Sequence, residues 1–199
     1  IITDHHTCKD RLPTAAAAIL NPKRPDCDYP FDALAGVGVA FKFILALAIK
    51  NRLKTTDVFN QYVDIATLGT IADVVPLLGE NRVIVDKGLK ILHNPKRIGI
   101  RAIMEVAGVL DKPLNASTIA FSIAPRLNAA GRLGSAATAV ELLLTNDESR
   151  ARELALLLDT ENKERQQTER QIFDEALELI AKDPNFEKKK VIVLAQENW

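Results

Sequence analysis

Asp4, His5 and His6 are the side chains whose types and spacing most clearly suggest chemistry. They directly follow residues 1–3, a β-branched run typical of the end of a strand. Ligands of open α/β sheets bind at the carboxyl ends of strands, so this position favours a functional role. Imidazole and carboxylate groups together suit a divalent ion such as Mn²⁺, Zn²⁺ or Fe²⁺ better than Ca²⁺. The triplet therefore predicts a metal site, with a solvated loop that carries two histidines as the alternative.

The two adjacent histidines raise a question of direction. Neighbouring side chains on an extended segment point to opposite sides, so one imidazole would face a cleft and the other would turn away, unless the strand end bends. A carboxylate beside a ligating histidine can also orient the ring. Asp4 thus has two candidate roles, as a metal ligand and as a support for a histidine.

A second acidic side chain, Asp73, lies in the apolar run from 69 to 77 and is flanked by Ile, Ala and two Val residues. Carboxylates in apolar surroundings are usually paired or coordinate a metal. We expect residues 69–76 to form a loop that presents Asp73. A helix cap and a metal ligand are both compatible with this position, and the histidine-bearing strand end favours the ligand.

Residues 125–135 bring two guanidinium groups and an amide together around Gly131, and we expect them to form a basic loop. Glycine allows the backbone to approach a ligand closely. Arginine matches the geometry of two phosphate oxygens at once, and the start of the next helix favours anions. The sequence therefore predicts a phosphate-binding loop, with an ordinary solvated turn as the alternative. The candidate phosphate contacts are Arg126, Asn128 and Arg132.

Apolar periodicity predicts the helices that must position these groups. They are expected at 34–53, 56–68, 80–92, 99–109, 115–124 and 136–144, and a strand is expected at 191–195. Residues 148–182 contain neither Pro nor Gly and predict a helix about 50 Å long. Its middle, 159–171, has no large apolar residue, which is typical of a helix that bridges two domains across solvent. A coiled coil is the alternative, but no apolar seam crosses the middle.

Composition limits the class of protein. The chain has 199 residues, 47% of them apolar, with 26 basic and 26 acidic residues and a net charge of zero. A globular α/β protein is expected, with any nucleic-acid surface confined to a local basic stripe. Its two cysteines lack the spacing of a zinc site or a disulfide framework, which favours the reducing cytoplasm. No uncharged apolar run approaches about 18 residues, so no membrane span is expected.

Together, these residues resemble the DHH phosphoesterase superfamily and, more narrowly, its RecJ group of single-strand-specific DNA exonucleases. The resemblance rests on the Asp-His-His triplet within 2–6 and on the stretches 34–42, 69–82 and 125–132, and it covers essentially the whole chain. It implies an α/β fold with a DHH-type parallel sheet and flanking helices. Residues 1–146 would be the helix-rich C-terminal portion of the DHH domain, 147–183 a long interdomain helix, and 188–199 the first strand of a DHHA1 domain.

The resemblance also implies 5′-to-3′ hydrolysis of single-stranded DNA in repair and recombination, with Mn²⁺ or Mg²⁺ and two ions in the intact protein. It implies that His5 ligates metal, that Asp4 and His6 ligate or support, and that Asp73 is a further ligand. Arg126, Asn128 and Arg132 would contact substrate phosphate.

The family's first two motifs are not among these residues, and neither is the glycine-rich motif of its downstream domain. We therefore expect an internal piece of a longer protein with little or no nuclease activity alone.

The expected partner is single-stranded DNA, with a single-strand-binding protein and helicases as further candidates, and a monomer is expected. Two alternatives remain. One is a DHH phosphodiesterase for oligonucleotides or cyclic dinucleotides. The other is a non-catalytic DNA-binding or replication-scaffold relative, against which the retained Asp4, His5, His6 and Asp73 argue.

Overall fold

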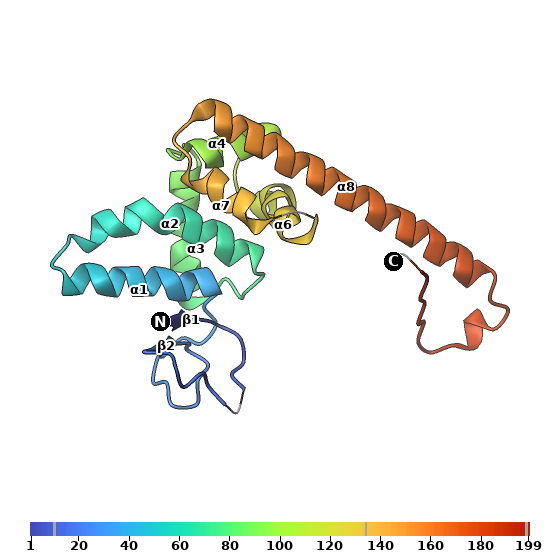
Figure 1. The fold of residues 1–199 in the computed structure, drawn as a ribbon, viewed down its shortest axis with the longest axis horizontal. Coiled ribbons are helices and arrows are strands. Elements are labelled where there is room, and N and C mark those ends of the chain that lie inside the picture. The colour runs from blue at the N-terminus through green and yellow to red at the C-terminus, as the bar shows by residue number, and fades with distance from the viewer. Residues whose placement is uncertain (10, 134, 198) are drawn as a thin grey trace.

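A computed structural model describes residues 1–9, 11–133, 135–197 and 199. Strands β1 (Ile2–Thr3) and β2 (Ile19–Leu20) pair in parallel, with Ile2 opposite Ile19. Helices stack on one side of this small sheet, and the last long helix projects away from them (Figure 1). The helical elements are α1 (Gly36–Lys50), α2 (Thr55–Ala72), α3 (Gly79–Leu92), α4 (Ile98–Val106), α5 (Ala116–Thr118), the π-helical η1 (Ile119–Ile123), α6 (Ala124–Leu133), α7 (Ala136–Leu144), α8 (Glu148–Ala181) and the 3₁₀-helical η2 (Phe186–Lys188).

The first helical layer is formed by α1, α2 and α3, and its backbones approach closely. A Cβ atom added at Gly69 would lie 2.7 Å from Val37 Cγ1, and one added at Gly88 would lie 1.8 Å from Thr67 Oγ1. No other residue type would allow these helices to pack at the same distance. This tight packing fixes the start of α1 and the end of α2. Both lie beside His5, just after the end of β1.

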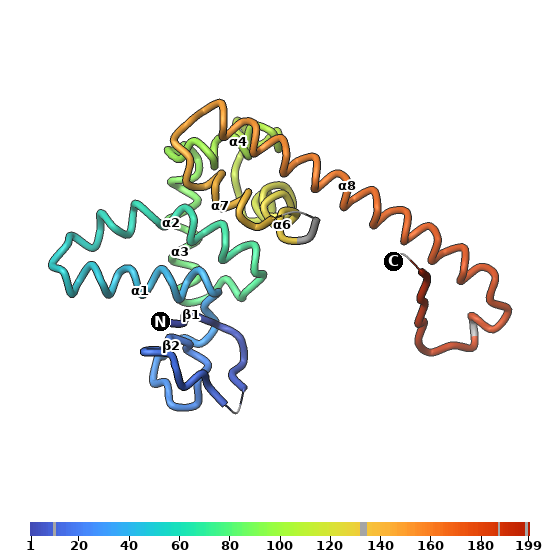
Figure 2. The backbone as a smooth tube through the Cα atoms, viewed as in Figure 1, coloured from blue at the N-terminus to red at the C-terminus, as the bar shows by residue number. Residues whose placement is uncertain are grey.

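The second layer joins α4, α6 and α7 to the first half of α8. Its fully buried side chains include Ile100, Ile103, Leu142 and Leu158. Every buried residue of α8 lies at or before Asn162. The rest of α8 extends beyond this core, and the chain then turns back beneath it (Figure 2).

The helix-rich α/β class and the positions of the predicted helices are confirmed, with three corrections. Residues 69–72 are not in a loop, because α2 continues to Ala72. Residues 125–133 are also helical rather than a loop. The helical run is continuous from 116 to 133, so Pro125 lies inside it, directly after the π-helical η1. The fully buried Ala129 and Ala130 anchor this helix.

The third correction concerns the strand expected at 191–195, since the structure assigns none there. A strand needs a neighbour that completes its hydrogen bonds, and the described part of the chain provides none beside this segment. The segment is instead largely exposed, and Trp199 donates from Nε1 to Glu175 Oε2 at 2.7 Å. None of the helices in the described ranges has both the length and the apolarity to cross a membrane.

Candidate metal centre

The triplet lies where β1 ends, and the chain bends there. Asp4 Oδ1 accepts hydrogen bonds from the backbone amides of His5 at 2.7 Å and His6 at 3.2 Å. The same oxygen lies 2.8 Å from His6 Nδ1. This turn brings the two imidazole centroids to 4.3 Å, so the rings do not point to opposite sides. One ligand atom from each of the three residues lies within 4.8 Å of the others, which is a spacing that one metal ion can bridge.

Asp4 is anionic across the physiological pH range. Its pKa is lowered to about 2, chiefly by the hydrogen bond to the His6 side chain and then by the two backbone amides. The carboxylate can therefore attract a cation without first losing a proton. A donor set of one carboxylate and two imidazoles fits a divalent transition metal.

His5 is the most enclosed member of the triplet, with 15% of its side chain exposed, against 77% for His6. Its ring lies between Gly36 at the start of α1 and Asp73 after α2. His5 Nδ1 is 3.4 Å from Asp73 Oδ2. A carboxylate at one ring nitrogen orients the imidazole and leaves the other nitrogen available for a metal.

Asp73 is the C-cap residue of α2 and is exposed, so the expectation of an apolar environment is wrong. The following Val74 is 86% exposed and adopts a left-handed backbone conformation with φ of 58°. The apolar residues around Asp73 therefore belong to an exposed helix end and do not bury its carboxylate. Of the two interpretations left open by the sequence, the helix cap is observed, and the contact with His5 keeps the metal-ligand interpretation open.

Arg126 does not project freely into solvent. Its Nε donates to Asp159 Oδ1 at 2.8 Å, and its Nη1 donates to the carbonyl of Ser122. Lys163 Nζ lies 2.7 Å from the other oxygen of Asp159, whose side chain is 8% exposed. Burial raises the pKa of Asp159, but Lys163 and Arg126 outweigh it and hold the pKa below its usual value. The guanidinium thus ties α6 to α8.

The other two candidate phosphate contacts are Asn128 and Arg132, and the structure describes the side chain of Asn128 alone. Asn128 is exposed on α6 and lines a cavity of about 210 Å³ with Val74 and Arg165. Arg132 belongs to α6, but its side chain lies outside the described part of the structure. The residues on either side of Asp73, Ala72 and Val74, both line this cavity, which lies between the end of α2, α6 and α8. Arg165 does not stand out in the sequence, because no local pattern distinguishes one charged residue in the polar middle of the long helix from the others.

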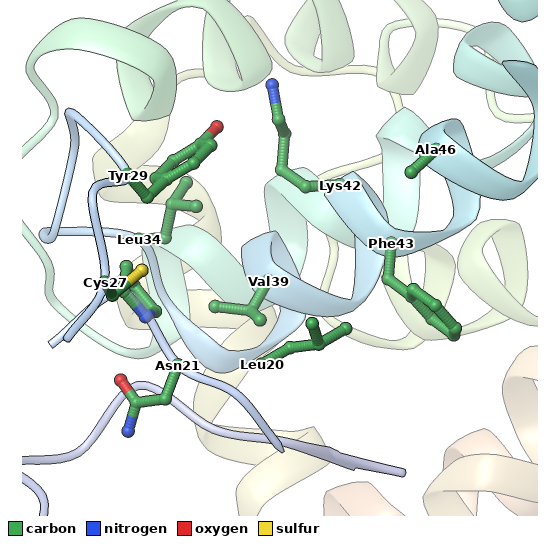
Figure 3. Close-up of a pocket in the computed structure, with 10 residues that line it drawn as sticks. Leu20, Asn21, Cys27, Tyr29, Leu34, Val39, Lys42, Phe43 and Ala46 are labelled. Atoms are coloured by element: carbon green, nitrogen blue, oxygen red, sulfur yellow. The ribbon is translucent and has the colours of Figure 1, made fainter. Parts of the chain in front are cut away.

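A second cavity, of about 220 Å³, is unrelated to the triplet. It is apolar and lies between β2, the segment that follows it and α1, with Leu20, Cys27, Val39 and Phe43 among its lining residues (Figure 3). Tyr29 and Lys42 point to one side of it, and both bond to Glu80, at 2.6 and 2.9 Å. No titratable group of the metal cluster lines this cavity.

Comparisons with known proteins identify the family and the fold. Residues 1–70 match the model of the DHH family, N-terminal domain. The chain is 43% identical over 199 residues to the single-stranded-DNA-specific exonuclease RecJ of Bacillus subtilis (strain 168), covering 100% of this chain and 24% of that protein. It is 42% identical over 193 residues to the RecJ of Escherichia coli (strain K12), covering 92% of this chain and 33% of that protein.

Two solved structures share the fold. A structure of exonuclease RecJ bound to manganese superposes with a TM-score of 0.78 at 36% identity, covering 92% of this chain and 44% of that one. A structure of RecJ in complex with Mn²⁺ from Thermus thermophilus gives a TM-score of 0.76 at 37% identity, covering 92% of this chain and 26% of that one.

The chain belongs to the DHH family, and its α/β fold is the DHH type. Within that family it groups with the RecJ exonucleases. It spans about a quarter to a third of the length of the curated relatives described above.

Proposed function

We propose that this chain carries part of the metal centre of a single-stranded-DNA exonuclease. The observation that carries the proposal is the cluster of Asp4, His5 and His6 at the end of β1, with ligand atoms within 4.8 Å of one another. The single-stranded-DNA-specific exonuclease activity of the similar RecJ proteins and the Mn²⁺ bound in two RecJ structures support it. The proposed reaction is 5′-to-3′ hydrolysis of phosphodiester bonds during DNA repair and recombination.

Each residue of the cluster has a proposed role. Asp4 supplies the anionic ligand, His6 lies beside it, and His5 ligates through the nitrogen that does not face Asp73. A divalent ion, Mn²⁺ or Mg²⁺, supplies Lewis acidity at the phosphorus and a nucleophilic water when bound. Asp73 orients His5 or ligates as well. A second ion would need ligands beyond this cluster.

The proposed strand path follows the cavity between the end of α2, α6 and α8. Asn128 and Arg165 line it and offer polar contacts to a backbone, while Val74 and Pro125 offer apolar surface. Its volume of about 210 Å³ suits part of a single strand rather than a duplex. Arg126 is already paired with Asp159 behind this wall, which favours Asn128 over Arg126 as a direct phosphate contact. Arg132 remains a proposed contact.

We also propose the domain organisation that the family resemblance implies. Residues 1–146 would be the C-terminal, helix-rich portion of a DHH domain, 147–183 a long interdomain helix, and 188–199 the start of a DHHA1 domain, although they form no strand in this structure. We further propose a monomer that acts in the cytoplasm, with single-strand-binding protein and helicases as candidate partners.

Metal titration tests the proposal. Isothermal titration calorimetry with Mn²⁺ should detect binding to the chain, and His5→Ala should weaken the affinity at least about tenfold, because an enclosed ligand is lost. His93→Ala is the matched control, since His93 is an exposed C-cap of α3 away from the cluster, and it should bind like the parent. Absence of Mn²⁺ binding even with the complete site assembled would instead favour a non-catalytic scaffold relative.

Substrate preference distinguishes the proposed exonuclease from a phosphodiesterase for oligonucleotides or cyclic dinucleotides. With the complete site assembled, a 5′-labelled single-stranded oligonucleotide should be degraded faster than a cyclic or linear dinucleotide. The reverse preference would favour the phosphodiesterase for short or cyclic substrates.

A further inference from the structure

Gly36 occupies the first position of α1 and directly faces the imidazole of His5. A Cβ atom built on Gly36 would lie 3.2 Å from His5 Cδ2 and 3.8 Å from Nε2. Backbone conformation does not demand glycine here, because its φ lies outside the left-handed region. Neither does helix formation, since glycine is a poor helix former. The remaining physical consequence of the missing side chain is the space that it leaves for His5.

We propose that Gly36 is a positioning residue for the metal centre, because a Cβ atom at this position would crowd the His5 ring where it lies against the start of α1. This inference rests on the proposed metal-binding function of His5. The ring is confined on three sides by Gly36, by Asp73 at 3.4 Å and by the His6 ring at 4.3 Å. A methyl group at position 36 displaces the ring toward one of these neighbours or outward to solvent.

A displacement of a few tenths of an ångström matters at this position. Metal–ligand distances tolerate about 0.2 Å. An imidazole is rigid and turns about only two bonds, so it cannot yield by bending its far end as a long flexible side chain can. Gly36→Ala therefore moves the whole ring and with it the nitrogen that ligates.

Gly38 provides a matched control on the same helix. A Cβ atom added there would also lie 3.2 Å from its nearest neighbour, but that neighbour is Cδ2 of Leu34. Leucine has more rotamers available and no role in the metal cluster. Gly38→Ala thus reproduces the crowding and the gain in helix propensity without touching His5.

The sign of the stability change separates a positioning role from a structural one. Alanine forms helices better than glycine, so Gly36→Ala should melt at the same temperature as the parent or higher. If Gly36 served packing alone, its replacement would lower stability. A variant that binds metal more weakly but is as stable as the parent therefore indicates a positioning role.

The experiment measures the reactivity of each histidine toward diethylpyrocarbonate by mass spectrometry, without metal, together with Mn²⁺ affinity. In Gly36→Ala, His5 should react several-fold faster, approaching the rate of the exposed His6, and Mn²⁺ affinity should fall at least about tenfold. Gly38→Ala should match the parent in both, with His93 as an internal reference.

An unchanged His5 rate in Gly36→Ala overturns the inference. If Mn²⁺ does not bind even with the complete site assembled, the proposed function fails, while the His5 rates still decide whether Gly36 seats the ring.

Discussion

Val74 is the residue whose conformation fits its type least. A β-branched side chain is held at φ of 58° directly after Asp73, and it is almost fully exposed. For residues other than glycine, the left-handed region costs about 1–2 kcal/mol. Strain of this kind is often retained beside functional sites. Here it turns the chain out of α2 immediately after the carboxylate that faces His5.

Replacing Val74 with glycine should stabilise the chain. Glycine removes the left-handed penalty, but its more flexible unfolded state costs roughly 0.5–1 kcal/mol on folding, so the expected net gain is about 0.5–1 kcal/mol. Urea denaturation followed by circular dichroism measures it. Val74→Ala keeps the penalty and should show no gain. A less stable glycine variant would mean that the exposed valine contributes contacts that outweigh its strain.

Between elements, the contact of α6 with α8 includes a mostly buried ion pair between Arg126 and Asp159, and the exposed Lys163 lies beside the same carboxylate. Asp159 is paired with Arg126 at 2.8 Å and with Lys163 at 2.7 Å. Removing one member of a buried pair leaves the other charge without compensation. The helix that bears Asn128 is therefore fixed to α8 by electrostatics as well as by the packing of Ala129 and Ala130.

Asp159→Asn should lower the free energy of unfolding by about 3–5 kcal/mol at neutral pH, since Arg126 then stays buried without an anion. Because the pKa of Asp159 is lowered in the folded chain, its contribution is present above the unfolded value of about 3.9. It is lost as the pH falls through the lower folded value. Urea denaturation at pH 7 and at about pH 3 should thus show the variant's deficit shrinking in acid.

Glu169→Gln is the control for that comparison, since Glu169 pairs with Arg165 on the exposed face of the same helix. It should change stability little at either pH. An equal deficit of Asp159→Asn at both pH values would show that packing, not charge, explains the loss.

Over the whole molecule, the two halves of α8 differ. The first half packs on α4, α6 and α7, whereas no residue after Asn162 is buried among those described (Figure 1). Local stability follows such burial. Hydrogen–deuterium exchange should therefore show protected amides at 152–162 and faster exchange at 165–180. Uniform protection along the helix would indicate that the distal half is held by contacts such as those from the returning tail.

The sequence by itself determined what depends on neighbouring residues. The Asp-His-His triplet after a β-branched run, the periodic helices and the uninterrupted α8 all rest on local order, because apolar period and the absence of helix breakers act over a few turns. Even so, Pro125 and Gly131 suggested a loop where burial of Ala129 and Ala130 produces a helix. The apolar residues around Asp73 likewise suggested that its carboxylate is buried, whereas it lies at an exposed helix end.

Only the tertiary structure decided which distant groups meet. Asp73 lies 68 positions after His5, and Asp159 lies 33 positions after Arg126. No periodic pattern specifies such pairs, because they depend on how whole helices pack across the core. The same packing places Gly36 against His5 and Arg165 beside Asn128. The sequence thus supplied the candidate metal ligands, and the helix packing determined which residues surround them.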